Sequence, residues 1–133
     1  MGQFSQSMQA IIEAGRLTKA ALSRSQGKWD EDRQLLRHLQ ELRNFAVTAS
    51  SKSYINVGNH RNMGFEKLDD ALGQAAKNLC MLNTPGFNDK SSWNKKTSPA
   101  SVSKSDLENW INELMESARE QINLHKKLKL PDD

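Results

Sequence analysis

The chain of 133 residues contains one cysteine, Cys80, three prolines and one tyrosine. A single cysteine cannot build a disulfide framework, so nothing in the composition indicates an oxidising compartment, and we expect a cytoplasmic protein. No apolar run approaches the roughly 18 residues needed to cross a bilayer, and the N-terminus lacks the apolar core of a secretory signal. The sequence therefore predicts a protein without a membrane partner.

Residues that favour β-sheet are also scarce. There are only eight Val and Ile residues against 15 Leu, which favours helix over strand. Leu, Ile, Val and Phe together make up about one fifth of the chain, which is close to the lowest fraction typical of globular proteins. Chains with so few apolar residues stay disordered when their net charge is high, but the net charge here is only +3. We expect a folded all-α protein with a thin core, to which a binding partner could add stability.

Apolar residues recur at three- and four-residue spacing in four segments, as on one face of a helix. The predicted helices span about 5–25, 31–52, 62–82 and 105–129. Gly15 lies within the first apolar stripe, where another backbone could approach closely. A chain of this length is the size of one domain, so we predict a single helical domain over residues 1–133, a bundle of about four helices.

The stripes predict which side chains are buried. Leu17, Phe45 and Leu128 belong to the apolar stripes of the first, second and fourth predicted helices, and we expect them in the core. Cys80 stands between Leu79 and Met81, an apolar setting that raises the pKa of a thiol, so it is predicted to be a packed residue and not a nucleophile.

The starts of two helices carry capping signals. Asp30 precedes the second predicted helix and is followed by acidic residues that suit the positive end of a helix dipole. Ser105 and Glu108 have the spacing of a capping box, which predicts that the last helix begins at Ser105.

Residues 84–103 form a long loop before the last predicted helix. The segment has no apolar periodicity and is rich in Ser, Lys and Asn, and loops of this length are unusual inside a compact domain. We expect residues 86–102 to be mobile in the isolated protein.

No motif indicates catalysis, a metal or a cofactor. The Glu-x-x-His spacing of metal-binding bundles is absent, although His38 and Glu41 share a helix face, and there is neither a Gly-x-Ser-x-Gly elbow nor a Gly-rich phosphate loop. We predict that the protein is not an enzyme and needs no cofactor. A helical ribonuclease or toxin that uses His38 or His60 as general acid or base stays open as an alternative.

Positive charge is concentrated in two segments. Residues 1–29 carry four basic residues and one acid, and residues 84–105 carry four lysines and one acid, whereas residues 106–133 are acidic overall. With a pI near 9.1, this pattern fits contact with RNA or DNA, with an aromatic ring stacking on bases. The candidate contact residues are Arg16, Lys19, Arg24, Lys28, Trp93, Lys95 and Lys96.

The same split of charge suits docking to a protein partner or self-association. We therefore expect a non-catalytic helical subunit or adaptor that docks into a larger assembly, which could itself be a nucleoprotein. A nucleic-acid-binding module that uses the basic residues and Trp93 is the alternative.

Overall fold

The structure, a computed structural model, describes residues 2–51, 62–81 and 98–130 of the chain. Within this part of the chain all regular elements are helical, which confirms the predicted all-α bundle. The elements are α1 (Gln3–Arg24), η1 (Trp29–Glu31), α2 (Arg33–Ser51), α3 (Met63–Asn78), η2 (Pro99–Ser101) and α4 (Lys104–Lys127), where η1 and η2 are single 3₁₀ turns.

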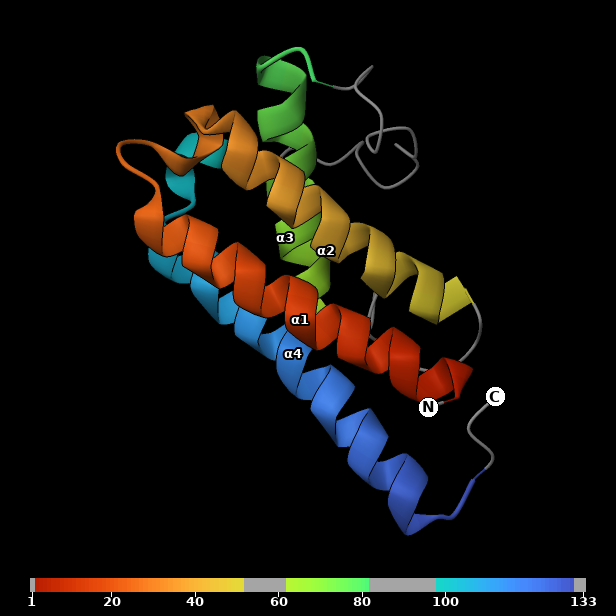
Figure 1. Cartoon of the computed structure of the whole chain (residues 1–133). Coiled ribbons are helices and arrows are strands. Elements are labelled where there is room, and N and C mark those ends of the chain that lie inside the picture. Colours follow the sequence, from red (N-terminus) through yellow and green to blue (C-terminus); the bar gives the residue numbers. More distant parts are fainter. Residues whose placement is uncertain (1, 52–61, 82–97, 131–133) are drawn as a thin grey trace.

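Helix α1 lies between α2 and α4, and α3 crosses behind them (Figure 1). Contacts at both ends show that α1 and α4 are antiparallel: Lys104 donates to the carbonyl of Ser25, and the His125 ring stacks on Phe4. Helix α3 packs against both α2 and α4. The core therefore lies where the faces of all four helices meet.

The apolar stripes of the helices form this core. The largest fully buried side chains are Met8, Ile11, Leu35, Leu36, Leu39, Leu42, Leu68, Leu72, Met81, Leu107 and Ile111. All of these residues lie in the predicted helices, where an α-helix brings residues three and four apart onto one face.

Leu17 and Phe45 were predicted to be buried, and both predictions are wrong. Leu17 is 49% exposed, because Thr18 takes the inward position on α1. The Thr18 hydroxyl donates to the carbonyl of Ala14 (2.6 Å) and also lies 3.2 Å from the carbonyl of His38 on α2, so this buried polar group is satisfied. Phe45 is 37% exposed, while the neighbouring Arg43 turns inward.

At Gly15 a side chain of α4, and not a backbone as predicted, comes close to α1. A Cβ atom at residue 15 would lie 2.5 Å from Cγ and 2.7 Å from Sδ of Met115 on α4. Both distances are below van der Waals contact, so the absence of a side chain at residue 15 allows α1 and α4 to pack this closely.

The predicted N-caps of α2 and α4 are wrong by two residues each. Asp30 lies inside η1, and the Asp32 carboxylate accepts the Leu35 N–H (3.0 Å) at the start of α2. At α4 the cap is Ser103: its hydroxyl accepts the Asp106 N–H (3.1 Å), and the Asp106 carboxylate accepts the Ser103 N–H (3.0 Å). The capping box is thus formed by Ser103 and Asp106, each two residues before the predicted Ser105 and Glu108, so the helix begins earlier than predicted.

Helix α3 ends at Asn78, earlier than predicted, in a Schellman motif. The Cys80 N–H donates to the Lys77 carbonyl and the Met81 N–H to the Ala76 carbonyl. Cys80 occupies the left-handed position, with φ 56°, and is exposed, so the prediction of a packed thiol is wrong. The motif turns the chain so that Met81 is buried in place of Cys80.

The last residues of the predicted mobile loop are packed. Residues 98–102 contain η2, in which Pro99 is buried, and the Val102 carbonyl accepts the indole N–H of Trp29 (2.6 Å). The expected mobility is therefore wrong for this part of the loop. The rest of the loop, with Trp93, Lys95 and Lys96, lies outside the described residues.

Candidate interaction surface

The burial pattern of α4 changes after Ala118. Up to that residue the apolar face of the helix is buried, whereas Leu124, Leu128 and Leu130 are 46%, 56% and 49% exposed. Helix α3 meets α4 near Ser117, whose hydroxyl accepts a hydrogen bond from Asn62, the N-cap residue of α3 (3.1 Å). Ile122 is still partly buried against the core, whereas Leu124, two residues later, points to the other side of the helix. In Figure 1 the blue end of α4 lies apart from α2 and α3.

This end of α4 nevertheless has a defined conformation. The His125 ring stacks on Phe4 of α1, with ring centroids 3.9 Å apart and planes 14° apart. A second Schellman motif follows, in which the Lys129 N–H donates to the Lys126 carbonyl and the Leu130 N–H to the His125 carbonyl. The exposed leucines are thus held on an ordered backbone, as a preorganised binding surface requires.

Lysines flank the leucines at the C-terminal end of α4, whereas the exposed Glu120 lies one turn before Leu124. Lys126, Lys127 and Lys129 are exposed, and the sequence contains no acidic residue between 121 and 130. None of the three lysines forms an ion pair with any part of the chain that the structure describes. We call Leu124, Leu128, Leu130 and these lysines the α4 terminal surface. Lys126 and Lys127, in the last turn of α4, also complement the negative end of the helix dipole.

The predicted basic residues in and after α1 differ in their exposure. Arg16 pairs with Glu13 on the surface (3.1 Å), and Lys19 is half-buried near α4. Arg24 and Lys28 are exposed around the end of α1.

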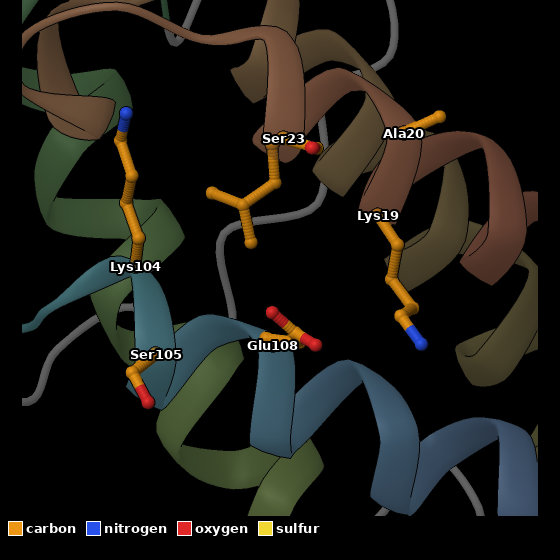
Figure 2. Close-up of a pocket in the computed structure, with 7 residues that line it drawn as sticks. Lys19, Ala20, Ser23, Lys104, Ser105 and Glu108 are labelled. Atoms are coloured by element: carbon orange, nitrogen blue, oxygen red, sulfur yellow. The ribbon is translucent and has the colours of Figure 1, made fainter.

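A hollow of about 560 Å³ lies on the surface between the last turns of α1 and the first turn of α4. Figure 2 shows Lys19 and Lys104 on its two sides, with the Glu108 carboxylate between them. Because this carboxylate would repel an anion, and Lys104 already donates to the Ser25 carbonyl, the hollow does not have the chemistry of a phosphate site.

A hydrogen-bonded network beside the hollow joins three helices. The Ser25 hydroxyl donates to the Asp32 carboxylate (2.7 Å), while Lys104 donates to the Ser25 carbonyl. The bond from Ser25, followed by that from the Leu35 N–H, lowers the pKa of Asp32 below its ordinary value. These groups hold the ends of α1, α2 and α4 together, and the sequence gives no periodic signal for them.

The three histidines stand in different surroundings. His38 is half-buried, His125 stacks on Phe4, and His60 lies outside the described residues. Arg43, which a ribonuclease cleft could have used, is buried and bonded to Asp69 (2.7 Å). No group of three or more His, Cys, Asp or Glu side chains in the described segments could hold a metal ion.

Comparison with protein families, characterised proteins and solved structures finds no match to this chain. In the described segments, none of the helices combines the length and apolar character needed to span a membrane. The α4 terminal surface is therefore the feature on which a functional proposal is based.

Proposed function

We propose that the protein is a non-catalytic helical subunit that docks onto a protein partner through the α4 terminal surface. The observation that carries this proposal is the exposure of Leu124 and Leu128, one turn apart at the end of α4, and of Leu130, which follows the C-cap of the helix. Clusters of exposed apolar side chains mark interaction surfaces more often than single ones do.

The spacing of the leucines supports a helix that binds in a groove. Leu124 and Leu128 are four residues apart in α4 and its C-cap, so they lie on one face, as anchors of groove-binding helices do. Complete burial of one leucine is worth about 1.5–3 kcal/mol, so burying the exposed halves of three leucines would contribute roughly 2–4 kcal/mol. That is a substantial share of the binding free energy of a micromolar complex, about 8 kcal/mol.

The test compares two leucines of similar exposure. Leu128→Glu introduces a charge into the α4 terminal surface, and Leu17→Glu introduces the same charge on α1, where Leu17 is 49% exposed. In extracts of the source cells, tagged wild-type protein should elute as a species much larger than its 15.0 kDa chain. Leu128→Glu should shift the protein to monomer size, whereas Leu17→Glu should not. The unfolding midpoints of all three proteins should agree, because both residues are exposed.

Four results would count against this function. Wild-type protein at monomer size, or equal loss of the large species in both variants, would overturn it. Nuclease-sensitive association that Leu128→Glu leaves intact would support the nucleic-acid alternative. RNA cleavage by the purified protein, abolished in a His38→Gln/His60→Gln variant with retained fold, would support the ribonuclease alternative.

A further inference from the structure

We infer that the partner binds the α4 terminal surface with an apolar groove rimmed by Asp and Glu carboxylates. This inference rests on the proposed function and adds the chemistry of the partner. The charges of the surface carry it: Lys126, Lys127 and Lys129 stand beside Leu128 and Leu130 in the sequence, and residues 124–130 contain no acid.

The positions of the lysines determine which chemical groups must line the edge of a groove that covers the leucines. Lys127 precedes Leu128 directly, and Lys129 precedes Leu130, so burial of these leucines brings both ammonium groups to the edge of the groove. A lysine can lay its apolar stem along the covered surface while its charged end stays at the rim. Neutral or basic groups there would leave the ammonium groups partly desolvated without compensation, whereas carboxylates would stabilise them.

Other occupants fit the surface less well. Two copies that meet through the same surface would place lysines against lysines. A nucleic-acid backbone would bind the lysines but leave the leucines in water. Helices that lie on membranes present an apolar face along their length, whereas the apolar face of α4 is buried in the bundle up to Ala118.

The experiment uses matched charge reversals in the full chain. One variant carries Lys126→Glu, Lys127→Glu and Lys129→Glu, and its control carries Arg16→Glu, Lys19→Glu and Arg24→Glu, an equal change of charge on α1. We expect the first variant to associate with the large species at least about tenfold more weakly, and the control to change less than about threefold, because like charges across an interface are strongly unfavourable. Raising NaCl from about 0.05 to 0.5 M should weaken wild-type association in the same direction.

A photo-crosslinker at residue 127 of the otherwise wild-type chain identifies the groups that face the lysines. We expect crosslinked partner peptides rich in Asp and Glu, and we expect Leu128→Glu to abolish the crosslink. If Leu128→Glu dissociates the protein from the large species but lysine reversal and salt have no effect on association, the inference is wrong and the proposed function is still supported. If Leu128→Glu has no effect, both fail.

Two measurements on purified protein test the remaining occupants. A concentration-dependent dimer in light scattering that Leu128→Glu abolishes would replace the inferred partner with a second copy. Binding to phosphatidylserine vesicles but not to phosphatidylcholine vesicles, lost in the lysine reversal, would replace it with a lipid surface. We expect neither result.

Discussion

Cys80 closes α3 in a backbone conformation that suits glycine. Its φ of 56° is left-handed, where a Cβ atom costs roughly 1 kcal/mol or more. We expect Cys80→Gly to raise the free energy of unfolding by up to about 1 kcal/mol, because glycine removes this cost, partly offset by its larger entropy when unfolded. Urea unfolding measures the change. Cys80→Val, which is β-branched and resists this conformation, should be destabilising, and a stabilised Val variant would contradict the assignment.

Ser103 is expected to contribute about 1 kcal/mol to stability, the usual value of an N-cap side chain. Ser103→Ala removes the acceptor of the Asp106 N–H and should lower the unfolding free energy by that amount. Ser105→Ala is the matched control and should change it by less than about 0.5 kcal/mol. Equal losses in the two variants would mean that the box at Ser103 does not hold the start of α4.

Asp32 should make stability fall in acid. Its folded-state pKa is lowered from 3.8, mainly by the Ser25 hydroxyl, so ionised Asp32 stabilises the fold above that pH. This stabilisation is lost as the pH falls through the lowered pKa. We expect Asp32→Asn to be less stable than wild type at pH 7, with the difference shrinking below about pH 3.8. Denaturant unfolding across pH measures it, with Asp30→Asn as the control; a constant difference at all pH values would contradict it.

At the scale of elements, a buried ion pair joins α2 to α3. The Arg43 and Asp69 side chains are 3% and 2% exposed, so removing one partner leaves a buried charge. We expect Arg43→Met to cost about 3–5 kcal/mol and Arg43→Met/Asp69→Leu to cost less, since replacing both charges avoids that penalty. Thermal or chemical unfolding tests the order of the variants.

The exposed pair of Arg16 and Glu13 is the control for this prediction. Its side chains are 66% and 60% exposed, so Arg16→Met should cost less than about 1 kcal/mol. If the double variant at Arg43 and Asp69 is less stable than Arg43→Met alone, the Asp69 carboxylate left without Arg43 does not carry the expected penalty, and the prediction is wrong.

At the scale of the whole molecule, we expect cooperative unfolding in one step. Helix α1 packs on α2 and α4, α3 packs on the same two helices, and Trp29 bonds across to Val102. No described helix therefore has a core independent of the others. Far-UV circular dichroism and tryptophan fluorescence should give coincident denaturation curves, as for a single domain. Two separate transitions would contradict the predicted single domain over residues 1–133.

The four helices and most of the core follow from the sequence alone. Helix formation depends on neighbours three and four residues away, so the stripes around Met8, Leu39, Leu72 and Ile111 are visible without knowledge of the fold. The bounds agree with the predictions to within four residues, and the largest error is at the end of α3, where the Schellman motif begins.

Only the tertiary structure decided which side chains the bundle covers and which it leaves exposed. Thr18 is buried instead of Leu17 because its hydroxyl finds acceptors on α1 and α2. Leu128 continues the spacing of the buried face but is exposed, because α3 begins beside Ser117 and the blue end of α4 extends away from α2 and α3 (Figure 1). Periodicity is a property of one helix, whereas burial depends on where the neighbouring helices begin and end, and the candidate interaction surface arises from that difference.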